Sequence, residues 1–271
     1  MKPWKTGLRH TRIGFAILMA WAGWLMIGDG ATAQQFRIET EVFSDSSQAI
    51  ARSLTLFDGK TTYDFLMTAE EGAGDTPKFV VEEVVVFDQA KQRIHLLDQV
   101  NRQQLELGHS ELLSLVAGMQ SSEVLRARDE FLLEPKLTES FDPQSQQLQL
   151  SSPRLDYQVQ GQKIADSQIL AHYYSFADWA ARLNATDSRK LPPFARLQLN
   201  QALKRRGWIP TEVQFQLTTL EGAKISATAK HHTLVQLSDN DQLRIESVKK
   251  QLAEFPSVSL SRYRNLTTAT K

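Results

Sequence analysis

Cysteine is absent from this sequence of 271 residues. The absence excludes a disulfide framework, and it also excludes a lipid attached through a thiol. A chain without disulfides must be stabilised by its hydrophobic core alone. The sequence is long enough to bury such a core.

An excess of charge of either sign is also absent. The sequence has 31 basic and 31 acidic residues, so its formal net charge is zero. Without residues 1–33, 27 lysines and arginines stand against 30 aspartates and glutamates, a net charge of −3. No large basic field is present to hold nucleic acid or an anionic membrane surface. Nucleic acid is therefore not an expected partner.

Signatures of metal, phosphate and cofactor binding are missing as well. The sequence contains neither an H-E-x-x-H pair nor a glycine-rich phosphate loop, so we expect no cofactor and no metal site. One partial catalytic motif remains at Gly108-His109-Ser110, which resembles the first half of the G-x-S-x-G nucleophile elbow. Leu112 stands where that motif has its second glycine. This favours Ser110 as the N-cap of a helix over Ser110 as a nucleophile, and we assign no catalytic residue.

The first 33 residues have the three parts of a secretory signal peptide. Ile13 to Ile27 is a run of 15 residues without charge, and Ala31-Thr32-Ala33 is a small-x-small cleavage site. A spanning helix needs roughly 20 apolar residues, so cleavage after Ala33 is favoured over retention as a membrane anchor. The basic residues before the run are Lys2, Lys5, Arg9 and Arg12. The sequence thus predicts an exported protein, periplasmic or extracellular, with no transmembrane span after cleavage.

Residues 34–264 are predicted to form a single domain, followed by a disordered tail at 265–271. Apolar residues alternate with polar ones along many short segments, and Asp58-Gly59 is a preferred hairpin turn. These segments predict strands at 36–42, 54–57, 61–67, 79–87, 93–97, 103–107, 137–141, 146–150, 155–159, 213–217, 224–237 and 257–263.

Helical spacing replaces this alternation in the remaining segments. It predicts helices at 110–119, 122–132, 167–183, 192–206 and 243–255. Because hairpins pair antiparallel and the helices are clustered, the pattern favours an α+β fold over a doubly wound sheet. We expect one long curved antiparallel sheet with helices inserted and packed on one face.

Aromatic residues on the helix predicted at 167–183 are the best candidates for ligand contacts. Tyr173, Phe176 and Trp179 lie at helical spacing, which favours packing against the sheet but would also suit a ligand groove. His231 shares a strand face with Ala227, Ala229 and other apolar residues, whereas its neighbour His232 is expected to face solvent. A structural role for His231 is favoured, and ligand binding is the alternative.

Two glutamates interrupt the apolar strand predicted at 79–87. Glu82 and Glu83 are adjacent, so their side chains point to opposite faces and cannot share acid–base work. We expect one of them to be solvated and the other to lie at the rim or to pair with a lysine or arginine.

The order of these elements resembles that of the periplasmic lipoprotein carrier and outer-membrane lipoprotein receptor group (LolA/LolB-like). The common features are the strand pairs around Asp58-Gly59 and Asp88, the helix after Leu107 and the helices within 167–206. The similarity is one of pattern over most of residues 36–264. It implies a half-barrel, in which helices partly close a curved antiparallel sheet over an apolar cavity.

Three hypotheses for function follow. The first is a non-enzymatic binding or carrier module for an apolar or lipid-like ligand held between sheet and helices. The second is a structural protein of the cell envelope with a filled core and a protein partner. The third, and the least favoured, is a hydrolase that uses Ser110.

Overall fold

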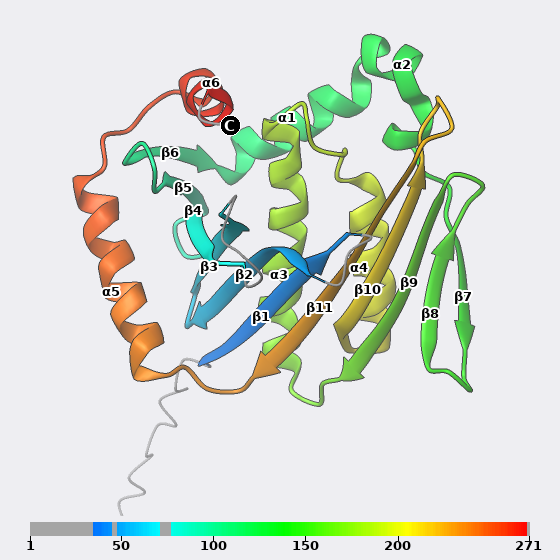
Figure 1. Ribbon diagram of the computed structural model, residues 1–271, viewed down its shortest axis with the longest axis horizontal. Coiled ribbons are helices and arrows are strands. Elements are labelled where there is room, and N and C mark those ends of the chain that lie inside the picture. Colours follow the sequence, from blue (N-terminus) through cyan, green and yellow to red (C-terminus); the bar gives the residue numbers. More distant parts are fainter. Residues whose placement is uncertain (1–34, 45–47, 71–76, 270–271) are drawn as a thin grey trace, which may run out of the picture. The chain divides into compact units, whose positions relative to one another are not determined.

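A computed structural model describes residues 35–44, 48–70 and 77–269 (Figure 1). All of these residues belong to one compact unit, Ala33–Lys271. The predicted signal peptide, with Ala31 and Ala33 at its cleavage site, lies outside the described residues.

Eleven antiparallel strands form one open sheet in the part of the chain that is described, in the order β6-β5-β4-β3-β2-β1-β11-β10-β9-β8-β7. The expected α+β class with a large antiparallel sheet is therefore confirmed. The strands are β1 (Gln35–Phe43), β2 (Ala49–Asp58), β3 (Thr61–Ala69), β4 (Phe79–Asp88), β5 (Arg93–Asp98), β6 (Gln103–Gly108), β7 (Thr138–Asp142), β8 (Gln147–Ser151), β9 (Leu155–Lys163), β10 (Trp208–Thr218) and β11 (Lys224–Leu234).

The centre of the sheet joins strands from the two halves of the sequence. The first six strands form a meander, in which each strand pairs with the next through a short connection. Strand β1 then pairs on its other side with β11 (Figure 1). Thr40 lies opposite His231 in this pair. The two halves thereby share one continuous surface on each face of the sheet.

Helices connect and follow the strands. They are α1 (His109–Ser121), α2 (Glu123–Leu133), α3 (Ser167–Arg182), the 3-10 turn η1 (Leu183–Thr186), α4 (Phe194–Arg206), α5 (Asp239–Glu254) and α6 (Leu260–Ala269). Local signals set several ends: the Asp166 carboxylate accepts from the amides of Gln168 and Ile169, and Gly207 ends α4 at φ +67°. Across the described ranges, no helix combines the length and the apolar character that a membrane span requires.

The helices cover both faces of the sheet. Adjacent residues of a strand point to opposite faces. Phe57 packs in a cluster with Tyr173 and Tyr174 of α3, whereas its neighbour Leu56 packs in a cluster with Ile245 of α5. We call these the α3 face and the α5 face. The expectation that all helices lie on one face is therefore wrong, because α5 also has an apolar stripe that a second sheet face must bury.

The end of the chain differs from the prediction of a last strand at 257–263. Only Ser257 bridges to the sheet, opposite Gln104, and the chain then forms α6. The helix starts at Leu260, and the backbone oxygen of the preceding Ser259 accepts from the Tyr263 amide at 2.9 Å. The structure also continues this helix through residues 265–269, which the sequence predicts as a disordered tail.

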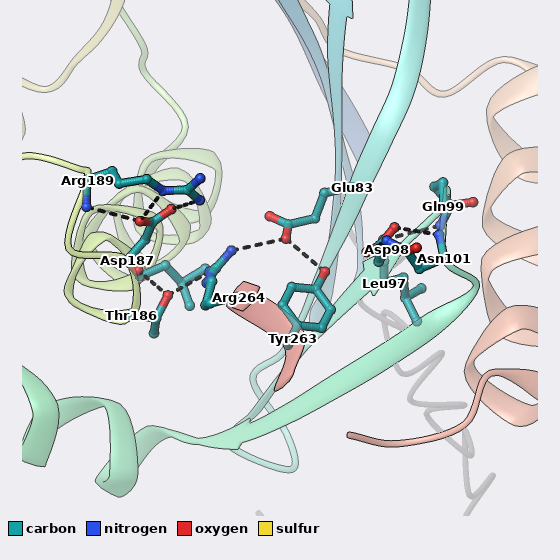
Figure 2. A network of polar contacts seen from close by, with 11 residues as sticks. Glu83, Leu97, Asp98, Gln99, Asn101, Thr186, Asp187, Arg189, Tyr263 and Arg264 are labelled. Atoms are coloured by element: carbon teal, nitrogen blue, oxygen red, sulfur yellow. Dashed lines mark hydrogen bonds and ion pairs between the residues drawn. The ribbon is translucent and has the colours of Figure 1, made fainter. Parts of the chain in front are cut away.

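Polar contacts attach α6 to the α3 face of the sheet and to η1 (Figure 2). The Tyr263 hydroxyl donates to the Glu83 carboxylate at 2.8 Å, and Arg264 lies 3.4 Å from the same carboxylate. Arg264 also donates to the Thr186 hydroxyl oxygen at 2.6 Å. The predicted pairing of one strand glutamate with a cation is thus confirmed for Glu83.

Candidate ligand-binding cavity

A cavity of about 440 Å³ lies between the α3 face of the central strands and the segment from α3 to the first turn of α4. Its helical side is formed by α3, by Asn184 of η1 and by Arg196 of α4. Its lining residues from the sheet are Ile38, Thr40, Ser53, Thr55, Asp64, Tyr157, Val213, Phe215, Ala227, Ala229 and His231.

Strand register assembles the polar part of this sheet surface. Thr40 of β1 lies opposite Ser53 of β2 on one side and His231 of β11 on the other. One row away, Thr55 of β2 lies opposite Asp64 of β3. These five side chains come from four adjacent strands and point to the same face, where a core would normally contain apolar residues.

Small side chains leave the space that the cavity occupies. Ala177 and Ala181 of α3 line its helical side, and Ala227 and Ala229 of β11 line its sheet side. Each alanine ends at Cβ, so helix and sheet enclose volume that larger side chains would fill. Aromatic rings border this space and give it apolar walls; they belong to Tyr157, Tyr173, Phe176 and Phe215.

His231 contributes a neutral imidazole to the cavity. Its Nδ1 lies 2.9 Å from the Thr40 hydroxyl oxygen, and its Nε2 is buried without a hydrogen-bond partner among the described residues. Burial, with a smaller contribution from the positive charge of Arg196, lowers the pKa of His231 to about 4. The ring is therefore uncharged at neutral pH.

Asp64 is the most buried acidic group at the cavity, with 8% of its surface exposed. The Thr55 hydroxyl donates to its carboxylate at 2.8 Å. Burial raises the pKa of Asp64 to about 7; the Thr55 hydrogen bond opposes this rise and the nearby charge of Glu83 adds to it. Its protonation therefore changes near neutral pH.

Arg196 supplies the positive charge of the cavity lining. Its Nε donates to the Asn200 side-chain oxygen at 3.1 Å, and Asn200 in turn donates to the Asp178 carboxylate at 2.9 Å. No ion pair of Arg196 occurs within the described part of the chain. Burial raises the pKa of Tyr173, and Arg196 partly opposes that rise.

Three of the four predicted ligand contacts line this one cavity: Tyr173, Phe176 and His231. The fourth, Trp179, does not. Its ring stacks on His109 with the ring centroids 3.8 Å apart, so it packs between α3 and α1. Trp179 lies next to Ala180 on the helix, and a step of one residue turns a helical side chain by about 100° away from the cavity.

Asp64 and Arg196 were not predicted from the sequence as site residues. A signal for Asp64 was present, because it stands between Tyr63 and Phe65 in a strand whose two faces are both buried. Arg196 gave no such signal, since it lies on a helix with a mixed polar and apolar pattern and its place over the sheet depends on the tertiary fold.

Ser110 is not arranged as a nucleophile. It lies in the first turn of α1 with an exposed side chain, and no hydrogen bond from its hydroxyl to an imidazole occurs among the described residues. The N-cap of α1 is Gly108, so the prediction of Ser110 as the cap is wrong by two residues. Within residues 35–44, 48–70 and 77–269, no group of three potential ligands could hold a metal ion.

A second cavity of about 370 Å³ is lined by charged residues of β1, β2 and β11 together with Arg244 of α5. Its opposite charges partly neutralise each other, since Arg52 pairs with Glu41 at 2.7 Å. It lacks the aromatic walls of the first cavity, apart from Phe79, whose ring lies 4.3 Å from the Arg52 guanidinium. The first cavity is therefore the better ligand site.

Known proteins give no direct guide to this site. No protein-family model matches the chain, and no curated protein matches it significantly.

Proposed function

We propose that this protein binds and carries an apolar or lipid-like ligand in the cavity beneath α3. The observation that carries the proposal is the cavity itself, because its volume of about 440 Å³ lies within the range of about 300–1,000 Å³ that is typical of ligand pockets. Aromatic and aliphatic side chains with a few convergent polar groups are the usual lining of such pockets.

The arrangement of sheet and helices supports a carrier more than an enzyme. We interpret the open sheet as a half-barrel that α3 and the first turn of α4 partly close, as the resemblance to lipoprotein carriers implies. Resemblance of fold is a weak argument for function on its own. The cavity favours this hypothesis over an envelope protein with a filled core.

Export is the second part of the proposal, and it rests on the sequence of residues 1–33. A carrier outside the cytoplasm would begin at Gln34. Intact-mass measurement of the protein purified from its native cells tests this point. We expect the mass of residues 34–271, and a mass that includes Met1 would contradict export by cleavage.

Binding is tested by titrating residues 34–271 with an environment-sensitive apolar dye and then displacing the dye with acyl-chain lipids. We expect saturable binding of one dye per chain. Ala227→Phe should reduce the affinity at least tenfold, because the ring would occupy the cavity. Ala171→Phe adds the same ring to the exposed side of α3 and should leave binding unchanged. Absence of saturable binding by dye and lipids would refute the proposal.

A further inference from the structure

The charges around the cavity are unevenly distributed. Arg196 lies at the side formed by β9, β10 and β11, where its charge acts on Tyr157, Tyr173 and His231. Asp64 lies at the other side, on β3, and the charges that act on it are those of Glu83 and Lys190. Three strand spacings separate β3 from β11, a distance of about 14 Å. The cavity therefore has a cationic end and an acidic end.

The cationic end has hydrogen-bonding capacity that the protein does not use. A guanidinium has five N–H donors; Arg196 gives one of them to Asn200 and also hydrogen-bonds to the Tyr173 hydroxyl, so further donors remain for a ligand. The bond from Asn200 to Asp178 fixes the position of that acceptor and so orients the guanidinium. The Nε2 of His231 is a buried polar atom without a partner in the described part of the chain. Buried polar atoms are almost always hydrogen-bonded, so this atom points to a ligand.

The contact with Thr40 gives His231 a defined role. If the Thr40 hydroxyl donates to Nδ1, the proton of the neutral ring lies on Nε2, which then becomes a donor. Arg196 and His231 would then present donors from α4 and β11 to the same end of the cavity. Two converging donors, one of them charged, suit an anionic oxygen group.

We propose that the ligand is an amphiphile with an anionic head, a carboxylate or a phosphate, which accepts hydrogen bonds from Arg196 and His231 while its apolar chain lies along the cavity. This inference rests on the proposed function and adds the chemical class of the ligand. The chain lies against Phe176, Val213 and Phe215. The ion-pair partner that Arg196 lacks within the described residues is then the head of the ligand.

Four probes that share a twelve-carbon chain test the assignment: dodecanoate, dodecyl phosphate, dodecanol and dodecyltrimethylammonium. Each is titrated calorimetrically into residues 34–271 below its critical micelle concentration. We expect dodecanoate or dodecyl phosphate to bind about 10- to 100-fold more tightly than dodecanol, since a hydrogen bond to a charged group contributes that factor. Whichever of these two acids binds more tightly identifies the head of the ligand as a carboxylate or a phosphate. The cationic probe should bind most weakly.

Variants separate the role of Arg196 from a general effect of charge. Arg196→Gln should remove the preference for the acids and leave the affinity for dodecanol unchanged, whereas Arg196→Lys should retain part of the preference. Lys204→Gln is the matched control, because it removes a positive charge from an exposed position of the same helix. It should alter none of the four affinities.

The outcomes distinguish the inference from the function on which it rests. If dodecanol binds as tightly as both acids, the inference of an anionic head is wrong, and the proposed carrier function is unaffected. If Arg196→Gln reduces the affinity for all four probes equally, Arg196 has a purely structural role, and the inference is also wrong. Failure of every probe, the dye included, would overturn the proposed function together with the inference.

Discussion

The hydroxyl oxygen of Thr40 and the Nδ1 of His231 lie 2.9 Å apart, although 191 residues separate them in the sequence. The pairing of β1 with β11 brings them together and places both at the cavity. The contact thus connects the pairing of the two halves of the sheet with the polarity of the site. Replacing either residue should affect both properties.

The buried imidazole of His231 should make the protein less stable in mild acid. Its pKa is about 4 in the folded chain and 6.5 for an ordinary histidine, as in the unfolded chain. The unfolded chain therefore takes up a proton first as the pH falls. We expect the free energy of unfolding to decrease between pH 6.5 and pH 4 by up to about 3 kcal/mol from this residue.

Urea denaturation at several pH values measures this effect. His231→Gln should reduce the slope of stability against pH over that interval, and the exposed neighbour serves as control in His232→Gln. Equal slopes for the parent protein and His231→Gln would contradict the burial of a neutral ring.

The Asp64 carboxyl should act in the opposite direction. Its pKa is raised from 3.8 to about 7, so the folded chain keeps a proton that the unfolded chain loses, and stability falls as the pH rises from about 4 through 7. Asp64→Asn should keep the hydrogen bond from Thr55 and remove this loss. We expect it to be more stable than the parent at pH 8 by about 1–4 kcal/mol. A destabilised Asn variant at pH 8 would show that the carboxylate is needed in its charged form.

The bond from Tyr263 to Glu83 should hold α6 against the sheet. Tyr263→Phe removes the hydroxyl donor, so the half-buried Glu83 carboxylate loses one hydrogen bond. This loss should cost about 1–2 kcal/mol of stability. Arg262→Ala changes an exposed position of the same helix and should have little effect. Thermal unfolding of both variants checks the prediction, and equal stabilities would show that the bond from Tyr263 to Glu83 contributes nothing to the attachment of α6.

Two glycines should respond in opposite ways to alanine. A Cβ at Gly161 would lie 2.7 Å from Cε3 of the Trp208 ring, so Gly161→Ala must displace the ring and should destabilise the protein by about 1–3 kcal/mol. A Cβ at Gly118 would meet no atom within 4 Å. Gly118→Ala lies within helix α1 and should stabilise it by about 0.5–1 kcal/mol. Denaturation curves that rank the two variants in the reverse order would contradict the packing at Trp208.

Local sequence signals predicted most of the elements. Alternation placed the strands, and the predicted helix starts at 122 and 167 and the predicted end at 206 coincide with or adjoin the caps of the structure, Ser122, Asp166 and Gly207. The turn between β2 and β3 was placed one residue early, because Asp58 pairs with Thr61 and the turn residues are Gly59 and Lys60. This shift changes the strand pairing by two residues, so each side chain keeps its face because the side-chain period of a strand is two.

Long-range pairing was beyond these signals. Val258 and Leu260 alternate as in a strand, yet Tyr263 follows Leu260 at helical spacing, and packing of Tyr263 against the sheet favours the helix. Likewise, the pairing of β1 with β11 depends on residues almost 200 positions apart, and it decides that Thr40, Asp64 and His231 share a cavity. The candidate site is thus a product of topology more than of any motif.

Photoaffinity labelling tests the central claim most directly. Dodecanoate that carries a diazirine in its chain is irradiated with residues 34–271, and the labelled residues are mapped by mass spectrometry. We predict labels on Tyr173, Phe176 and residues 213–231, which excess dodecanoate prevents and Ala227→Phe abolishes. Labels confined to the α5 face, or scattered labels that excess dodecanoate leaves unchanged, would contradict a ligand site beneath α3.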